Sequence, residues 1–444
     1  MMIFNSFEFI GFLAIVLIVS YLLNYRNLIK ERNLFLLLSS WVFYASFDFW
    51  FLILLGIVTI INYTSAILID KYQNKGKINV SVAIILSVGQ LAVMKYAYLF
   101  DNSVLLPVGL SFFTFQALSY TIDVYRKKIG VSKDFVKVSL FISFLPTILS
   151  GPIERATNLF PQLEVKAPIN YDNILAGVRL FVWGLFKKVV IADRLALYVN
   201  EVYAYPQGHS GTTLALAALF YSIQIYCDFS GYADMAVGVG RILGFQLMDN
   251  FRFPYFSKTI KSFWRKWHIS LTSWFTEYVY FSLGGNRVVK WRWIFNILCI
   301  FVLSGIWHGA TIAFLIWGLI HGIAYLIEYF MGMKKGNVLY GIICFIVVTL
   351  AWVYFRVDTF SAASNIIARI FTDFGGHLTM SVGGSAFSFY LTLLLLLIFM
   401  AREYFLYRNR NSQHVLVANI ESSLLLLAVA LFGVSGSSFV YFQF

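Results

Sequence analysis

His308 is the residue of this sequence best suited to acid–base chemistry. It lies in the segment Ser304–Ala310, at the end of one wholly apolar run and just before another. An ionisable side chain at membrane depth is costly, and such a residue is therefore a functional candidate by default. Because burial disfavours the imidazolium, we expect a neutral ring that can accept a proton. The alternative is a hydrogen-bonded packing histidine, with Gly305 and Gly309 serving either close helix packing or the approach of a substrate.

His268 stands among aromatic and basic residues. In the segment Phe263–Leu271, two tryptophans and a leucine recur at helical spacing and form an apolar stripe. The basic residues of this region are Arg252, Lys258, Lys261, Arg265 and Lys266. This pattern is typical of an amphipathic helix that lies in the membrane interface. Composition favours that interpretation over the alternative, a cytoplasmic opening whose cations attract the phosphates of a nucleotide-bearing substrate.

His321 follows His308 by 13 residues. On a continuous helix, at about 100° per residue, the two side chains would lie on different faces. A shared role therefore requires a break at Gly309. Two acidic residues, Asp228 and Asp234, also fall in an apolar stretch, where they could form structural ion pairs with Arg241 or Arg265, or relay protons.

Common catalytic signatures are largely missing from the chain. The sequence contains no Walker lysine loop, no Gly-x-Ser-x-Gly elbow, no zinc-binding His-Glu-x-x-His helix and no His-x4-Asp pattern. The three cysteines are scattered through apolar stretches without the spacing of a metal site or a disulfide framework. We expect no bound metal and no permanently bound cofactor.

The composition predicts that these residues are held by membrane helices. Of 444 residues, 60% are hydrophobic and 12% are charged, and the mean hydropathy is +0.76. A soluble domain carries about 25% charged residues, and a water-soluble fold of this composition would expose large apolar patches. The chain is therefore predicted to be an all-α polytopic membrane protein. Its net charge of +13 is spread over short runs between apolar segments, which favours cytoplasmic loops over nucleic-acid binding.

Continuous apolar runs mark the expected membrane spans. They cover residues 7–23, 34–46, 49–69, 79–100, 105–125, 172–192, 211–227, 293–308, 311–331, 338–355, 386–401 and 415–434. Three further stretches, 135–153, 229–248 and 258–282, are expected to be intramembrane or interfacial without spanning. Prolines and a glycine interrupt the first of these, which should therefore border a cavity. We expect one membrane domain over 1–444, with its motif-bearing core at about 105–330.

Clusters of lysine and arginine recur after every second expected span, which sets the orientation of the chain. The first cluster, Arg26, Lys30 and Arg32, follows the first span and places the N-terminus outside. The alternation also leaves the C-terminus outside.

The chain resembles the membrane-bound O-acyltransferase (MBOAT) family, specifically its bacterial branch that acetylates polysaccharides. A series of motifs carries the resemblance, each weak alone but specific in this order. They lie at 106–116, 120–126, 151–153, 226–232, 263–271, 283–287 and 305–310. The resemblance implies a ring of about 11–12 transmembrane helices, with re-entrant and interfacial helices around a central funnel.

The resemblance also implies roles for individual residues. His308 would be the catalytic base of the Trp-His-Gly motif, with His268 as the second family histidine and His321 as a third. Residues expected to shape the site or its tunnel are Trp307, Gly305, Gly309, Asp228 and Asn286. The acyl donor would be cytoplasmic acetyl-CoA, with its phosphates held by the basic residues of 252–266. A separate extracytoplasmic partner of the SGNH-hydrolase type would attach the acyl group to a polymer outside the cytoplasmic (inner) membrane.

Several functions remain open at this point. Peptidoglycan is the favoured acceptor, followed by alginate or another exopolysaccharide. Transfer of D-alanine, or acylation of a lipid or a protein, would be alternatives within the same family. A proton-coupled transporter or flippase, and a non-catalytic scaffold, are alternatives of other classes.

Overall fold

The computed structural model describes residues 2–97, 106–333, 336–375, 378–379, 385–409 and 419–434. Its contacts divide the chain into two compact units. Unit 1 comprises Met1–Val182 and Tyr232–Asp249, and unit 2 comprises Trp183–Gly231 and Asn250–Phe444. Every regular element of the described residues is a helix.

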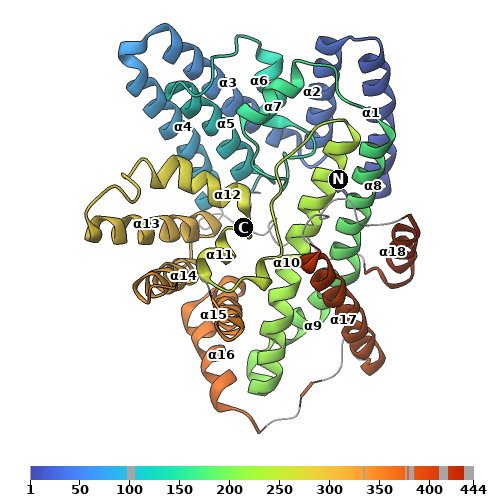
Figure 1. Ribbon diagram of the computed structural model, residues 1–444, viewed down its shortest axis with the longest axis vertical. Helices are drawn as coiled ribbons and strands as arrows, with labels where there is room; N and C mark the ends of the chain where they lie inside the picture. The colour runs from blue at the N-terminus through green and yellow to red at the C-terminus, as the bar shows by residue number, and fades with distance from the viewer. Residues whose placement is uncertain are drawn as a thin grey trace. The chain divides into compact units, whose positions relative to one another are not determined.

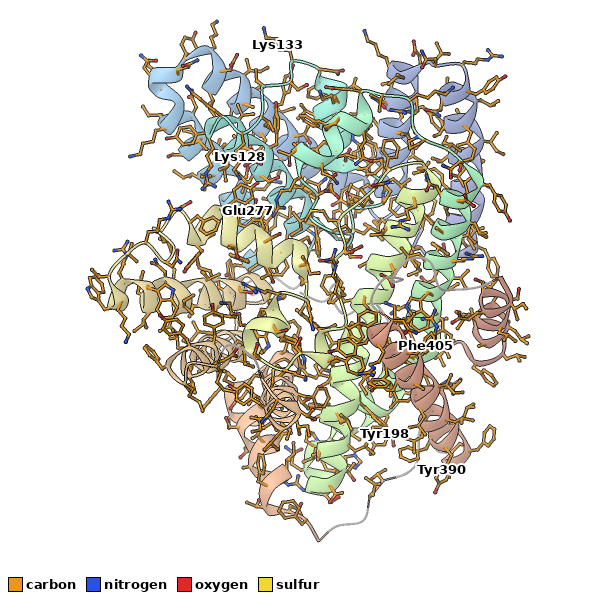
Figure 2. All side chains as sticks on the ribbon, viewed as in Figure 1. Lys128, Lys133, Tyr198, Glu277, Tyr390 and Phe405 are labelled. Atoms are coloured by element: carbon orange, nitrogen blue, oxygen red, sulfur yellow. The ribbon has the colours of Figure 1, made fainter. Side chains whose placement is uncertain are left out.

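Unit 1 is built mainly from the first seven α-helices. They are α1 (Phe7–Tyr25), α2 (Ile29–Ala45), α3 (Phe49–Lys71), α4 (Gly76–Ala97), α5 (Leu110–Tyr125), α6 (Phe135–Ser143) and α7 (Ala156–Leu163). Helices close to one another in the sequence pack together, α1 on α2 and α3 on both α4 and α5 (Figure 1). The hydroxyl of Ser6 caps α1 and the carboxylate of Asp48 caps α3, each accepting a hydrogen bond from a first-turn N–H. Figure 2 shows Lys133 in the connection from α5 to α6, where it is exposed.

Unit 2 contains the C-terminal helices and all three candidate histidines. After α8 (Tyr171–Phe186), its elements are η2 (Lys187–Ala192), α9 (Asp193–Ala204), α11 (Ile260–Trp264), α12 (Ile269–Trp274), η5 (Phe275–Tyr280), α13 (Lys290–His308), α14 (Ile312–Phe330), α15 (Val338–Arg356), α16 (Phe360–Thr372), α17 (Ala386–Arg408) and α18 (Asn419–Phe432). Figure 2 shows Tyr390 and Phe405 on α17, both more than half exposed, whereas Tyr198 of α9 is fully buried. Large apolar side chains exposed along such helices are expected where lipid surrounds a protein.

The chain is a multi-pass membrane protein. Eight described helical segments are long and apolar enough to span a bilayer. They are Phe7–Tyr25, Phe49–Lys71, Gln73–Ala97, Gly211–Ile242, Lys290–His308, Ile312–Phe330, Val338–Arg356 and Ala386–Arg408. The other four expected spans coincide with shorter helical pieces, namely α2, α5, α8 with η2, and α18. Residues 98–100, 105 and 415–418 of three expected spans, and the C-terminus whose side was predicted, lie outside the described residues.

One expectation about the spans was wrong. The predicted span 211–227 and the separate interfacial stretch 229–248 are replaced by a single helix of 32 residues, α10 (Gly211–Ile242). Its most hydrophobic window is 83% buried inside the protein, far more than in any other candidate span. A helix enclosed by protein needs no lipid-facing stripe and can carry polar residues that have partners. The polar residues that suggested an end of the span therefore lie inside α10.

Irregular backbone follows α6, as the prolines predicted. Residues 145–153 are buried throughout. The carboxylate of Glu154, also fully buried, accepts hydrogen bonds from the backbone N–H groups of Arg155 and Met248 and from the side chain of Asn158. Desolvation is the main cause that raises the pKa of Glu154. These hydrogen bonds hold a non-helical segment in place where surrounding protein shields its backbone.

Arg32 was expected in a cytoplasmic loop but lies in α2, where it is fully buried. Its guanidinium donates to the carbonyl oxygens of Val165 and Leu163 and to the side chains of Asn24 and Asn33. The arginine thus ties the α1–α2 pair to the segment after α7. A guanidinium carries five donors, so it can satisfy several carbonyl groups that a loop leaves unpaired.

Candidate active site

His308 is the last residue of α13. Gly309 ends the helix, with its N–H donating to the carbonyl oxygen of Gly305 at 3.1 Å, and α14 begins at Ile312. The chain therefore breaks at Gly309, which is the condition under which His308 and His321 can act in one site. The helix end also directs its carbonyl dipoles at His308, which stabilises positive charge when the ring accepts a proton.

Close packing of α13 on α14 accounts for the glycines around His308. A Cβ atom added at Gly305 would lie 3.1 Å from the carbonyl carbon of Phe314 and closer still to its oxygen. A Cβ atom at Gly318 of α14 would lie equally tightly against the carbonyl group of Phe301. One at Gly309 would overlap the ring of Phe314. The small-residue spacing thus lets two backbones approach directly.

Aromatic rings surround the imidazole of His308. Its ring centroid lies 4.5 Å from that of Trp307, 5.1 Å from that of Trp317 and 4.9 Å from that of Phe355, each in an edge-to-face arrangement. His308 is 3% exposed. This apolar enclosure limits water around the ring and strengthens any electrostatic interaction made there.

His268 is held in a defined orientation by Asn250. The Oδ1 atom of Asn250 lies 3.0 Å from Nδ1 of His268, and it also accepts hydrogen bonds from the N–H and hydroxyl of Ser270. The Ser270 N–H can only donate, so the atom facing His268 is an oxygen and Nδ1 must carry the proton. In the neutral ring, Nε2 is then the basic nitrogen.

The surroundings of His268 keep it neutral. The side chain is 1% exposed, and burial lowers its pKa to about 3. The ring of Phe229 stands edge-to-face against it at 4.6 Å. The backbone at His268 is left-handed, with φ 42° and ψ 56°. This conformation is uncommon for a residue with a side chain and recurs at functional sites.

His321 of α14 is fully buried, and neither ring nitrogen has a hydrogen-bond partner among the described residues. Its ring lies 4.9 Å from that of Trp264, 5.1 Å from that of Trp317 and 6.3 Å from that of Trp352. The indole N–H groups of these tryptophans are likewise buried without a partner in the described part of the chain. Buried polar atoms normally have partners, so this cluster is suited to water or to a polar group of a substrate.

The three histidines are connected through two tryptophan rings. Trp307 contacts both His268, at 6.2 Å, and His308, and Trp317 contacts both His308 and His321. Histidines 53 positions apart in the sequence thus belong to one aromatic cluster within unit 2.

The five basic residues lie along the connection from α10 to α12. Arg252, Lys258, Lys261 and Arg265 are exposed, whereas Lys266 is half-buried with its amine 5.7 Å from the ring centroid of Tyr407. The backbone N–H of Arg252 donates to the carbonyl oxygen of Lys266, which brings the two ends of this segment together. These cations therefore lie on the same segment of the chain as His268.

Asp228 pairs with a lysine that the sequence analysis did not consider. Its carboxylate lies 2.7 Å from the amine of Lys188, which also lies 2.7 Å from Asp193, and all three side chains are almost completely buried. Lys188 belongs to η2, a π-helical segment, and π-helical turns are frequent at functional sites. Sequence reasoning missed this group, although a Lys-Lys pair within an expected span was its signal.

Asn286 is not brought together with the histidines. It is exposed on the turn before α13, whereas His308 ends that helix. Over the described residues, no group of three or more histidine, cysteine, aspartate or glutamate side chains is placed to hold a metal ion.

Comparisons with known proteins agree with the arrangement of motifs. The model of the membrane-bound O-acyltransferase family matches residues 25–333, which is more than half of the chain. This chain belongs to the membrane-bound O-acyltransferase family. It is therefore an O-acyltransferase, and the matched region contains all three histidines of the aromatic cluster.

Curated relatives narrow the branch of the family. Over 396 residues the chain is 35% identical to the probable alginate O-acetylase AlgI of Pseudomonas aeruginosa, covering 84% of this chain and 75% of that protein. It is 33% identical over 406 residues to the peptidoglycan O-acetyltransferase of Helicobacter pylori, covering 81% and 76%. Similarity to the teichoic acid D-alanyltransferase of Bacillus subtilis, at 32% identity, covers 49% of this chain. The chain is thus an O-acetyltransferase of the alginate and peptidoglycan type.

Proposed function

We propose that this enzyme takes an acetyl group from cytoplasmic acetyl-CoA and passes it across the membrane for O-acetylation of an extracytoplasmic polysaccharide. Peptidoglycan is the first acceptor to test, and alginate or another exopolysaccharide the second. The observation that supports the proposal best is the buried His308, placed at a helix end inside an aromatic enclosure that also reaches two further histidines. Names of the relatives support acetylation of a polysaccharide.

His308 is the proposed general base. The acceptor hydroxyl loses its proton to the imidazole as its oxygen forms a bond to the thioester carbonyl carbon. The carbon–sulfur bond then breaks, and the imidazolium returns the proton to the CoA sulfur, which leaves an ester, free CoA and neutral His308. A thioester is already reactive, so orientation and proton transfer are the main contributions required of the enzyme.

Trp317 is the proposed donor to the developing oxyanion. Its indole N–H is buried without a partner among the described residues, and its ring contacts that of His308. A fixed donor in a dry site stabilises the negative charge that forms on the carbonyl oxygen. The two ring nitrogens of His321, which have no partner among the described residues, would bind a second polar group, either of the acyl donor or of the acyl acceptor.

His268 and the basic segment are proposed to position the acyl donor. The fixed orientation of His268 leaves Nε2 as an acceptor, so this ring orients a hydroxyl or an amide of the substrate. The exposed cations at 252, 258, 261 and 265 suit the CoA phosphates. In this proposal these cations face the cytoplasm, and both termini lie on the outer side of the bacterial inner membrane. An SGNH-type partner on that side completes transfer of the acetyl group to the polymer.

The acceptor is identified by tracing labelled acetyl groups. Inside-out membrane vesicles that enclose an acceptor polymer, with and without an SGNH-type partner, are supplied with [14C]acetyl-CoA from outside, where their cytoplasmic face lies. Label on peptidoglycan supports the full proposal, and label on alginate supports the class but changes the acceptor. Label that remains on lipid or protein contradicts it.

The matched variants are His308→Ala and His209→Ala. His209 lies outside the histidine cluster, with Nδ1 3.3 Å from the hydroxyl of Thr379. We expect transfer to be lost in the first variant and retained in the second. Equal transfer by both variants would contradict a base at His308.

A further inference from the structure

An open groove lies at the end of α13 opposite His308. It forms where the loop after η5 meets the first turn of α13, and it has a volume of about 670 Å³. Its lining residues are Leu283, Arg287, Val288, Val289, Trp291 and Arg292. Because α13 has 19 residues, its two ends are about 27 Å apart, and a ligand in the groove does not touch His308. We propose that this groove binds the phosphate of an anionic phospholipid headgroup.

Charge is the first argument for this ligand. From Tyr278 to Ile327 the sequence contains no acidic residue and three cations, Arg287, Lys290 and Arg292. Both arginines of the groove are exposed, and neither guanidinium has a carboxylate or hydrogen-bond partner among the described residues. An arginine guanidinium matches a phosphate with two parallel hydrogen bonds. Two such groups beside one groove therefore favour an anion with several acceptor oxygens.

The apolar side of the groove indicates a lipid rather than a free phosphate. Val289 is 61% exposed and Trp291 is 69% exposed, at the start of a helix apolar enough to span the bilayer. Tryptophan at the end of a span is typical of the membrane–water interface. The amine of Lys290 lies 4.7 Å from the ring centroid of Phe330, so this cation also extends along apolar surface. A phospholipid presents a phosphate and acyl chains together, which suits both parts of this surface.

The frame of the groove is fixed before any ligand arrives. The side-chain amide of Asn296 donates to the carbonyl oxygens of Leu283 and Gly285 at 3.2 and 3.1 Å. The indole N–H of Trp293 donates to the hydroxyl of Tyr280 at 3.0 Å. These hydrogen bonds join the loop to α13 and to η5. A preformed groove loses little conformational entropy on binding.

Native mass spectrometry of the full chain tests the proposal. Purified protein is titrated with phosphatidylglycerol and, separately, with phosphatidylcholine, which has the same phosphate but no net charge. The variant Arg287→Gln/Arg292→Gln is compared with Lys75→Gln/Lys77→Gln, a control that removes two exposed cations of unit 1. At about 1 kcal/mol per cation, the groove variant should bind phosphatidylglycerol roughly thirty-fold more weakly, and each single variant roughly five-fold. The control should bind it as the wild type does.

The proposal does not depend on the acyl donor, and its failure can be distinguished from failure of the proposed function. Acetyl-CoA binding is measured on the same variants. Weaker binding of phosphatidylglycerol with unchanged binding of acetyl-CoA supports a lipid site. Unchanged binding of phosphatidylglycerol overturns it, as would equal affinity of the wild type for the two lipids. Loss of acetyl-CoA binding alone would assign the groove to the nucleotide and would also overturn it.

Discussion

Substitution of Gly305 by alanine tests whether the α13–α14 contact positions His308. The added Cβ atom would lie 3.1 Å from the carbonyl carbon of Phe314 and closer to its oxygen, where ordinary contacts are 3.4–4 Å. Backbone atoms cannot rotate away as a side chain can, so the two helices must separate by on the order of 1 Å. Overpacking of this kind typically costs about 1–3 kcal/mol.

The same displacement should affect catalysis more than stability. Gly305 precedes His308 by one helical turn, and a misplacement of about 1 Å at a reacting group can reduce the rate roughly 100-fold. Thermal unfolding in nanodiscs measures the loss of stability, and acetyl transfer per folded molecule measures the loss of rate. We expect a lower unfolding midpoint and a lower kcat.

Gly56→Ala is the matched control for this experiment. Gly56 lies within α3, and an added Cβ atom there meets no heavy atom within 4 Å. Alanine in that position should leave the rate unchanged and raise stability by about 0.5–1 kcal/mol. If Gly305→Ala instead behaved like Gly56→Ala in both assays, the close contact would not be what positions His308.

Three further predictions follow from the site and its surroundings. Trp317→Phe keeps a six-membered aromatic ring but removes the N–H and the five-membered ring, so kcat should fall roughly 100-fold together with a modest loss of stability; an unchanged kcat would rule out this oxyanion donor. Asp228→Asn leaves Lys188 with one carboxylate, and chemical or thermal unfolding should show a loss of about 3 kcal/mol, whereas unaltered stability would argue against the buried ion pair. His268 has a pKa of about 3 in the folded protein and about 6.5 when unfolded, so the unfolded state binds more protons between these values and stability is lost as the pH falls below 6.5. Relative to His268→Gln, the wild type should therefore lose about 1 kcal/mol between pH 7 and 5.5, and parallel pH profiles would contradict the buried neutral ring.

Membrane helices were the most predictable part of this protein. Long apolar runs require spanning helices because lipid offers no hydrogen bonds to the backbone, and eight segments meet that requirement in the structure. The break at Gly309 was identified as a condition for His308 and His321 to share a site, and it is present between α13 and α14. Order of motifs along the chain also identified the family correctly.

Partners of buried polar residues could not be read from the sequence. Asp228 is 40 residues from Lys188, and nothing local distinguishes that partner from the arginines that were expected. For the same reason, the tryptophan that connects His308 to His321 appeared only in three dimensions, because Trp317 resembles an ordinary apolar residue of a span. The high burial of α10 likewise depends on the packing of distant segments, which hydropathy does not record.

Release of free CoA from acetyl-CoA tests the central claim most directly. Wild-type protein, His308→Ala and His209→Ala are compared in nanodiscs with an SGNH-type partner and a hydroxylated acceptor, with a thiol-detecting reagent as the readout. The account predicts release by the wild type and by His209→Ala, and none above background by His308→Ala. Release by His308→Ala at the wild-type rate would contradict the claim that this buried histidine is the base of an acyl transfer.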